Sequence, residues 1–267
     1  MNEHPWSTCS PDGRRTRILD LLQERGELAV GELAEVCGVS GMTIRRDLQL
    51  LSDEGKVLRT HGGAVTTARV SFEFRFLERS RHNVREKRQI GAVAAGLVAP
   101  GASVLLDSST TTLAIARQLR STRPLTIVTT SLAIAAEMFG QPEIDTLLLG
   151  GMLRKDTPDL FGALTEHTLE RLRADVAFIG ADAIGYDGWV YYASAEVAGM
   201  LERMGRAAPR RFIVADHDKI GGHQLVRLGH LRDWTGLITD DGISAAARRS
   251  LEEAGVRVMT AAGATAV

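Results

Sequence analysis

The chain has 267 residues, a net charge of −1, 24% charged and 44% hydrophobic residues, a composition typical of globular proteins that excludes disorder throughout. Its two cysteines, Cys9 and Cys37, have no CxxC or Cys/His spacing around them, which excludes a disulfide framework and favours a reducing, cytoplasmic location. The longest uncharged run, residues 89–106, is divided by Pro100-Gly101 into a helix pattern and a strand pattern, so we expect no membrane association.

Charge is distributed unevenly along the chain. Residues 1–88 carry 15 Lys+Arg and 13 Asp+Glu, whereas residues 89–267 carry 17 and 20. This small basic excess does not by itself indicate nucleic acid. Residues 1–13 have no basic start followed by an apolar stretch, so we expect a disordered leader rather than a signal peptide.

Residues 14–66 have the pattern of three short helices followed by a hairpin. The first helix turns Ile18, Leu21 and Leu22 to one face and ends at Gly26, and the second, over 30–37, repeats this spacing. Ser40 is a good N-cap for a third helix that turns Ile44, Leu48 and Leu51 inward. Helix, tight turn, helix and two short alternating stretches over 56–65 predict a winged helix-turn-helix domain.

The outward face of the third helix and the wing predict a DNA-reading surface. An Arg pair alone is more often a solvated helix face, but here few acids face outward and a basic ribbon follows. Arg can grip guanine, Gln can read adenine, and wing cations can contact phosphates. The predicted DNA-binding residues are Ser40, Met42, Thr43, Arg45, Arg46, Gln49, Lys56, Arg59 and His61.

Residues 67–88 are dense in charge and predict a linker or hinge helix. From 89 to 262, apolar strand patterns alternate with helices of about ten residues, which predicts an α/β domain with a doubly wound, mostly parallel sheet. The strand patterns are ASVLLD, LTIVTTS, DTLLLGG, DVAFIGADAI, RRFIVADHD, GLITDDG and VRVMTA.

Polar residues follow several of these strands, and the carboxyl ends of parallel strands meet in one crevice. In DSSTTT, residues 107–112, five hydroxyls stand between a strand and a helix, whose unpaired first N–H groups favour an anion. One hydroxyl suffices as an N-cap, so the surplus favours a phosphate site. Arg154 or Lys219 can complete the charge, and sugar hydroxyls can bind the acids Asp107, Asp182, Glu196 and Asp216.

Other functions fit parts of the same pattern. His217 and His223 lie six residues apart across two glycines, which matches no helical ligand pair, so we expect no metal site. The carboxylates can also move a proton between adjacent carbons, as in a sugar-phosphate isomerase with an accessory DNA-binding head. A head that serves only protein interaction is a third possibility.

Several segments resemble successive blocks of the DeoR family of bacterial transcription regulators, over about residues 14–242. They are GELAEVCGVSGMTIRRDLQLLSDEGKVLRTHGGAV, EKRQIGAVAAGLV, LLDSSTTT, LTIVTTS, LLLGGMLR and DVAFIGADAI. The resemblance implies a winged helix-turn-helix head and an effector domain with the fold of ribose-5-phosphate isomerase. It also implies a homo-oligomer, dimer or tetramer, that binds double-stranded operator DNA, represses sugar or nucleoside catabolism genes and is released by a phosphorylated sugar.

The resemblance also assigns individual residues. It places Thr43, Arg45 and Arg46 on the operator-reading helix, and Ser109, Thr130 and DHDK (216–219) stand where the family more often has Gly, Asn and Asp-Ser-Ser-Lys. Ala183 stands where ribose-5-phosphate isomerases carry Glu, so we expect a sensor with no catalytic residue and no cofactor besides the effector. The predicted effector-binding residues are Asp107, Ser108, Ser109, Thr110, Thr111, Thr112, Thr129, Thr130, Ser131, Gly150, Gly151, Arg154, Asp182, Glu196, Asp216 and Lys219.

Overall fold

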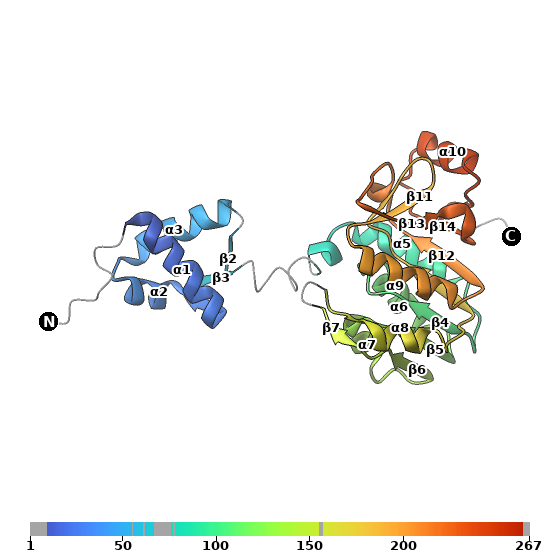
Figure 1. The fold of residues 1–267 in the computed structure, drawn as a ribbon, viewed down its shortest axis with the longest axis horizontal. Helices are drawn as coiled ribbons and strands as arrows, with labels where there is room; N and C mark the ends of the chain where they lie inside the picture. Colours follow the sequence, from blue (N-terminus) through green and yellow to red (C-terminus); the bar gives the residue numbers. More distant parts are fainter. Residues whose placement is uncertain are drawn as a thin grey trace. The chain divides into compact units, whose positions relative to one another are not determined.

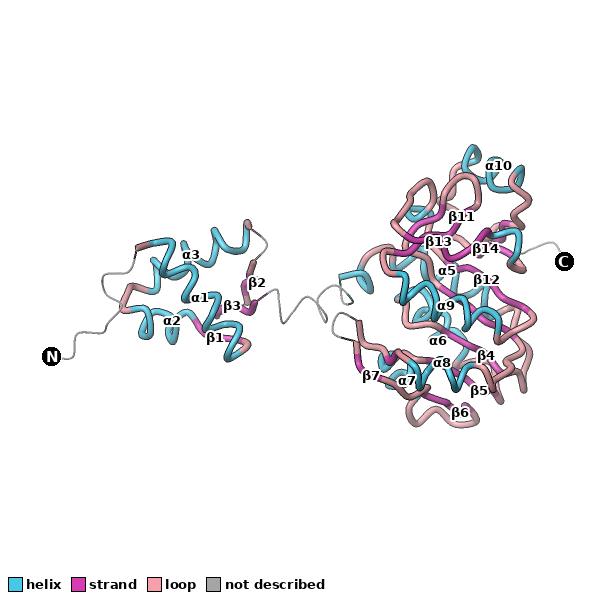
Figure 2. The backbone as a smooth tube through the Cα atoms, viewed as in Figure 1, coloured by secondary structure: helices cyan, strands magenta, loops and turns pink. Residues whose placement is uncertain are grey.

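The computed structural model describes residues 10–54, 56–60, 62–66, 76, 78–154 and 157–263. Contacts divide the chain into two compact units, residues 1–75 and 76–267, and the division lies inside the predicted linker. Figures 1 and 2 show the elements of each unit. Within the described ranges, no helix is long and apolar enough to cross a membrane.

The first unit combines three helices with a small antiparallel sheet. The helices are α1 (Pro11–Arg25), α2 (Val30–Cys37) and α3 (Gly41–Asp53), and the described strands run in the order β1 (Glu27–Ala29), β3 (Gly63–Thr66), β2 (Val57–Arg59). The predicted helix-turn-helix and wing are therefore present. Helix α1 begins within the stretch predicted as a leader, because Ser10 accepts a hydrogen bond from the Gly13 N–H and Pro11 suits a first turn.

The predicted inward positions of the helices form the core of this unit. Ile18, Leu22 and Ile44 are each fully buried, and they belong to one hydrophobic cluster. Strand β1 was not predicted, because three residues are too few to set up a pattern. It approaches β3 so closely that a Cβ on Gly63 would lie 2.1 Å from the Leu28 carbonyl oxygen, which only glycine allows.

The second unit is built on a parallel sheet, as predicted. Among the described residues it has seven strands in the order β15-β14-β12-β9-β4-β5-β6, and every neighbouring pair is parallel. Chain order reverses between β9 and β4, which makes the gap between them the topological switch point. The strands are β4 (Ser103–Leu106), β5 (Leu125–Thr129), β6 (Ile144–Leu148), β9 (Val176–Ile179), β12 (Arg210–Val214), β14 (Gly236–Ile238) and β15 (Val258–Met259).

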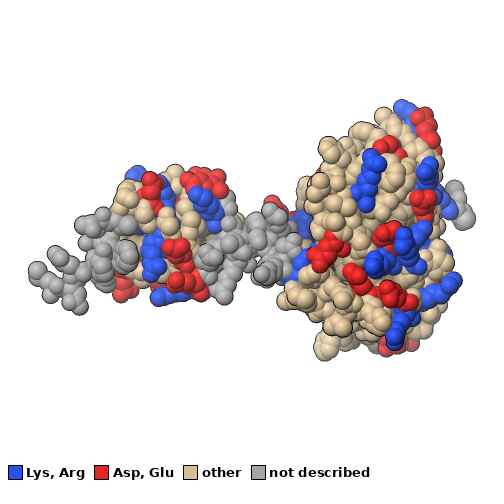
Figure 3. All heavy atoms as spheres, viewed as in Figure 1, with Lys and Arg blue, Asp and Glu red and all other residues tan. Residues whose placement is uncertain are grey.

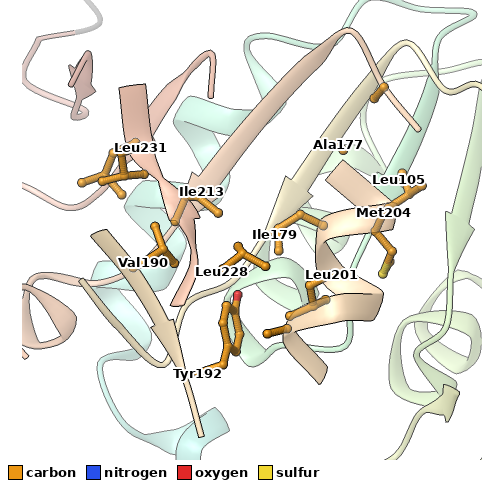
Figure 4. Close-up of a cluster of buried hydrophobic side chains, with 14 of the residues drawn as sticks. Leu105, Ala177, Ile179, Val190, Tyr192, Leu201, Met204, Ile213, Leu228 and Leu231 are labelled. Atoms are coloured by element: carbon orange, nitrogen blue, oxygen red, sulfur yellow. The ribbon is translucent and has the colours of Figure 1, made fainter. Parts of the chain in front are cut away.

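Helices cover both faces of this sheet. One hydrophobic cluster joins the sheet to α5 (Val84–Ala95), α6 (Thr110–Leu119) and α7 (Leu132–Met138). A second cluster on the other face, part of which is drawn in Figure 4, joins it to α8 (Ala163–Leu169), α9 (Ala195–Arg206) and α10 (Ala245–Glu253). Helix α5 begins at Val84, inside the stretch predicted as linker, because its buried Ile90 face packs against α6.

Two smaller sheets complete the described part of the second unit. β7 (Met152–Leu153) pairs with β8 (Leu160–Phe161), and β11 (Trp189–Tyr192) lies between β10 (Ala183–Ile184) and β13 (Val226–His230). The segment DVAFIGADAI, predicted as one strand, is two strands, β9 and β10. Gly180, Ala181 and Asp182 separate them, and this break lies at the switch point.

Candidate functional site

The third helix of the first unit exposes the side chains predicted to read DNA. Ser40 begins the helix by accepting a hydrogen bond from the Thr43 N–H at 3.2 Å, and the buried Ile44 fixes which face turns inward. Arg45 and Arg46 are exposed. Met42, 73% exposed, gives the same surface an apolar contact. This helix end therefore presents two guanidinium groups and a flexible apolar side chain to a partner.

The other predicted DNA-contacting side chains have hydrogen-bond or ion-pair partners within the first unit. Gln49 donates to Asp53 at 2.8 Å and accepts a hydrogen bond from Arg59, while Lys56 pairs with Glu54 at 2.8 Å. The Lys56 ammonium, by hydrogen bond and charge, lowers the pKa of the Glu54 carboxyl. All of these side chains are exposed, so exchanging these partners for a phosphate costs little. His61 lies outside the described residues.

Sequence reasoning missed a buried ion pair behind this surface. Asp47 is 3% exposed, and its carboxylate accepts two hydrogen bonds from the Arg14 guanidinium, at 2.6 and 3.3 Å. This contact joins α1 to the third helix on the side away from Arg45 and Arg46. Its sequence separation of 33 residues left no local signal.

In the second unit, Asp107 joins the loops on either side of the switch point. One of its carboxylate oxygens accepts from the Gly180 N–H at 2.8 Å, and the other accepts from the Thr112 hydroxyl at 2.6 Å and the Ser109 N–H at 3.0 Å. Burial raises the pKa of Asp107, and these hydrogen bonds oppose the rise. Both oxygens are thus committed to the protein, and Asp107 shapes the site.

Gly180 is required at this junction. A Cβ on it would lie 2.7 Å from the Ser109 side chain and 3.1 Å from the nearer Asp107 carboxylate oxygen. The two loops therefore meet in direct contact where β4 and β9 end. In an open parallel sheet this is the place where ligands bind.

The five hydroxyls of residues 108–112 have different roles. Ser109 caps α6 by accepting from the Thr112 N–H at 3.2 Å, and Thr112 is turned inward to Asp107. Ser108 donates to Asp159 at 2.7 Å. Thr110 and Thr111 form the first turn of α6, where the helix N–H groups and dipole favour an anion.

Three buried polar atoms at the carboxyl edge of the sheet have no hydrogen-bond partner among the described residues. They are the hydroxyl oxygens of Thr130 and Thr239 and one carboxylate oxygen of Asp216. Each residue follows a strand, respectively β5, β14 and β12. Buried polar atoms are almost always paired, so each of these three can take a polar partner. Thr130 and Asp216 follow strands on the two sides of the switch point, whereas Thr239 follows β14, one strand farther out. Thr239 was not among the predicted site residues, although it lies in the strand pattern GLITDDG.

The loop after β6 contributes a buried carboxylate that was not predicted. Asp159 is fully buried and accepts hydrogen bonds from Ser108 and Thr157, each at 2.7 Å, and from Arg154 at 3.1 Å. The Arg154 charge is therefore balanced within the protein. At Gly151 a Cβ would lie 2.4 Å from the Thr165 hydroxyl, which donates to the Gly150 carbonyl at 2.6 Å. This loop is thus packed tightly against α8.

The two remaining predicted acids differ in their burial. Asp182 is half-buried and accepts from the Ala193 N–H at 3.2 Å. Glu196 is exposed in the first turn of α9.

The buried Tyr192 hydroxyl donates to the Gly180 carbonyl, and burial raises the pKa of Tyr192. Figure 4 shows the Tyr192 ring within the hydrophobic cluster that contains Leu228 and Leu201. Tyr192 therefore links the core to the switch-point loop.

The predicted loop 216–219 contacts the segment before α5. Asp218 accepts from Asn83 at 2.7 Å, and the His217 ring lies 2.7 Å from the buried Asp240. The Lys87 ammonium is buried near Asp216 and donates to the carbonyls of residues 79 and 82 at 2.6 Å. Burial lowers the pKa of Lys87. Within the described ranges, no group of three or more metal-ligating side chains occurs.

Comparison with known proteins matches both units. The DeoR-like helix-turn-helix domain model matches residues 14–70, and the DeoR C terminal sensor domain model matches residues 82–241. The transcriptional regulator GlpR of Haloferax volcanii is 33% identical and covers 93% of this chain and 97% of its own. The glycerol-3-phosphate regulon repressor of Haemophilus influenzae is 31% identical, covering 85% and 89%.

Solved structures resemble this chain only distantly. Ribose 5-phosphate isomerase A of Methanocaldococcus jannaschii matches 52% of this chain and 55% of its own, at 18% identity and a TM-score of 0.38. That likeness is too weak to indicate shared chemistry. The sensor model, by contrast, spans more than half of the chain, and the relatives match nearly all of it. The chain therefore belongs to the DeoR family of DNA-binding transcriptional regulators.

Proposed function

We propose that the protein represses genes of sugar or nucleoside catabolism from an operator in the cytoplasm, and that a phosphorylated sugar bound to its sensor domain releases it. The observation that carries the proposal is the pair of unpaired buried atoms on Thr130 and Asp216, which follow β5 and β12 on the two sides of the switch point. A ligand rich in hydroxyl groups would pair them. The adjoining first turn of α6 offers N–H groups to a phosphate.

The two ends of the ligand would have different partners. The phosphate would bind Thr110, Thr111 and the α6 N–H groups, and the half-buried Lys219 would add a charge. The sugar hydroxyls would bind Thr130 and Asp216, and Asp182 is two residues from the switch-point Gly180. Thr239 follows β14, four strands from β5, which is about 19 Å at the usual strand spacing, so the same small ligand would not reach it. Asp107 and Thr112 would hold the loops in place without contacting the ligand.

A small phosphorylated polyol or sugar fits this arrangement. A relative from Haemophilus influenzae is named for a glycerol-3-phosphate regulon, which supports a small phosphorylated compound as the ligand class. On the DNA side, Arg45 and Arg46 would contact base edges, and Lys56 and Arg59 would contact phosphates.

The proposal includes no catalytic step. Among the described residues, the acids in the loops that directly follow β4 and β9 are Asp107, whose oxygens are both hydrogen-bonded to the protein, and Asp182, which is followed by Ala183. Asp159, which contacts Ser108, is paired with Arg154. None of these arrangements supplies a second acid or base beside Asp182 for proton transfer between carbons. Purified protein should therefore bind phosphorylated sugars and return them unchanged.

A thermal-shift panel tests the ligand assignment. Phosphorylated sugars and polyols are compared with their unphosphorylated forms and with inorganic phosphate, because a ligand that binds the native state raises Tm according to its concentration over Kd. We expect at least one phosphorylated compound to raise Tm where its unphosphorylated form does not. Turnover of that compound, or equal stabilisation by the free sugar, would contradict the proposal.

A further inference from the structure

The outer edge of the parallel sheet carries an apolar surface that the proposed effector site does not use. Strand β6 ends the sheet, and among the described strands it pairs only with β5. A free sheet edge presents unpaired N–H and C=O groups, which native proteins usually cover or charge. Here the edge ends in two exposed leucines, Leu147 at 42% and Leu148 at 36%.

Exposed apolar side chains continue from this edge onto the next elements. Met152 and Leu153 of β7 are 69% and 57% exposed, and Leu164 of α8 is 71% exposed. β7 follows β6 after three residues, and the hydrogen bond from Thr165 to the Gly150 carbonyl brings α8 against the same loop. We name this set, Leu147, Leu148, Met152, Leu153 and Leu164, the β6–β7 surface.

The five side chains of the surface are apolar, and β6 itself carries one exposed acid, Asp145. In the view of Figure 3, few charged side chains lie over the lower left part of this unit, whereas acidic and basic side chains are interspersed over the rest of it. The acid of α7, Glu137, is paired with Arg117 and Arg120.

Each of the five side chains is at least 36% exposed. Neighbouring residues of a strand point to opposite faces, so Leu147 and Leu148 flank the edge on its two sides. Exposed apolar surface of this kind often marks an interaction site.

We propose that the β6–β7 surface binds the same surface of a second copy of this chain across a two-fold axis. An edge strand can run antiparallel to its own copy, so one surface supplies both halves of the contact. A helix-turn-helix regulator also needs two heads to contact two half-sites. In the first unit, the described large apolar side chains that are exposed are Met42 and Leu50, and Met42 lies on the DNA-reading face, so the dimer contact falls to the sensor domain.

The register of β6 indicates how the two copies meet. Paired residues on neighbouring strands point to the same face of a sheet. Val128 is paired with Leu147 and belongs to the core on the α8 side, so Leu147 also points to that side. The Leu149 N–H donates to Thr129 on β5, which turns the N–H and C=O of Leu148 and Thr146 outward. A second β6 can therefore bond to these outward groups while Met152 and Leu164 pack across the axis.

The oligomeric state tests this interface. The variant Met152→Asp/Leu164→Asp is compared with wild type by light scattering after gel filtration across a concentration series, with Leu225→Asp as the matched control. Leu225 is 87% exposed outside the β6–β7 surface. We expect the double variant to halve the mass of the assembly and the control to keep the wild-type mass. A wild-type chain that is monomeric at every concentration, or a double variant that keeps the wild-type mass, would overturn the proposal.

A second measurement does not depend on the variant folding. Hydrogen exchange of the β6 amides, followed on the wild-type protein, should accelerate on dilution, because Thr146 and Leu148 lose their partners when copies separate. Exchange at β12, in the middle of the sheet, should not change. Rates at β6 that are independent of concentration while the mass of the assembly falls would place the interface elsewhere.

Discussion

Thr130 illustrates how a single side chain distinguishes a binding role from a structural one. Its hydroxyl is buried without a hydrogen-bond partner among the described residues, whereas the buried Thr112 hydroxyl donates to Asp107 at 2.6 Å. Leaving a buried polar group unpaired costs free energy, and removing a paired one costs about 1–3 kcal/mol. The two threonines should therefore respond oppositely to replacement by valine.

We predict that Thr130→Val keeps or raises the free energy of unfolding of the ligand-free protein and weakens effector binding about tenfold, the value of one hydrogen bond. Thr112→Val, the matched control, should lower the free energy of unfolding. Chemical denaturation gives the first quantity, and titration with the ligand found by thermal shift gives the second. Equal destabilisation by the two substitutions would remove Thr130 from the proposed site.

The arginine pair of α3 gives the corresponding prediction for DNA. Arg45→Ala/Arg46→Ala should weaken specific operator binding at least about 30-fold, because each base contact of this kind contributes about 1–3 kcal/mol. The melting temperature should not change, since both side chains are exposed. Arg25→Ala, which removes an exposed charge at the end of α1, is the control. Fluorescence anisotropy with an operator selected from random duplexes measures the effect, and unchanged affinity of the double variant would refute the assignment.

Local sequence patterns single out these residues but do not indicate their partners. The run of hydroxyls at 108–112 and the outward Arg45 and Arg46 follow from local patterns, because a strand, a cap and a helix wheel involve neighbouring positions. Asp159 was missed because its partner Ser108 is 51 residues away. For the same reason the pattern could not show that Asp107 faces Gly180, 73 residues on.

Hydrogen bonds and charge interactions of His217 and Asp218 hold the loop 216–219 in place. Burial by itself lowers the pKa of His217, but its hydrogen bond to Asp240 and the charges of Asp240, Asp218 and Asp216 raise it above its ordinary value. A raised pKa in the folded state means that the imidazolium stabilises the fold below about pH 6.5, the ordinary value for His. This stabilisation is lost as pH rises through the folded-state pKa.

We therefore predict that His217→Gln lowers the unfolding temperature most below about pH 6 and progressively less at higher pH. His223→Gln, which removes an exposed histidine from the following segment, is the control and should show a smaller pH dependence. Melting curves between acidic and alkaline pH measure both. A His217→Gln deficit that grows with rising pH would contradict the raised pKa.

The regular elements were predictable where burial leaves a pattern of sufficient length. Strands β4, β9 and β14 of the parallel sheet are largely buried, and each gives a continuous apolar run. Strands β1, β7 and β10 have two or three residues, too few for any period to appear. The division of DVAFIGADAI into two strands depends on contact between Gly180 and Ser109, which no local pattern contains.

In the whole molecule, the two units have different tasks. The first unit presents the DNA-reading helix, and the second unit holds the proposed effector site and the segment before α5, which Asn83 and Lys87 tie to loop 216–219. A ligand can shift the DNA-binding equilibrium only through different affinities for the bound and released states. Within the described residues, such a difference would pass from the proposed effector site toward the DNA-binding unit through the contact between this segment and loop 216–219.

The most direct test is release of operator DNA by the phosphorylated ligand. Operator affinity is measured by anisotropy at constant salt, with and without the compound that raises Tm, and with its unphosphorylated form as control. We predict that the phosphorylated compound lowers operator affinity and that the free sugar leaves it unchanged. A compound that binds the sensor domain and leaves operator affinity the same would contradict the central claim.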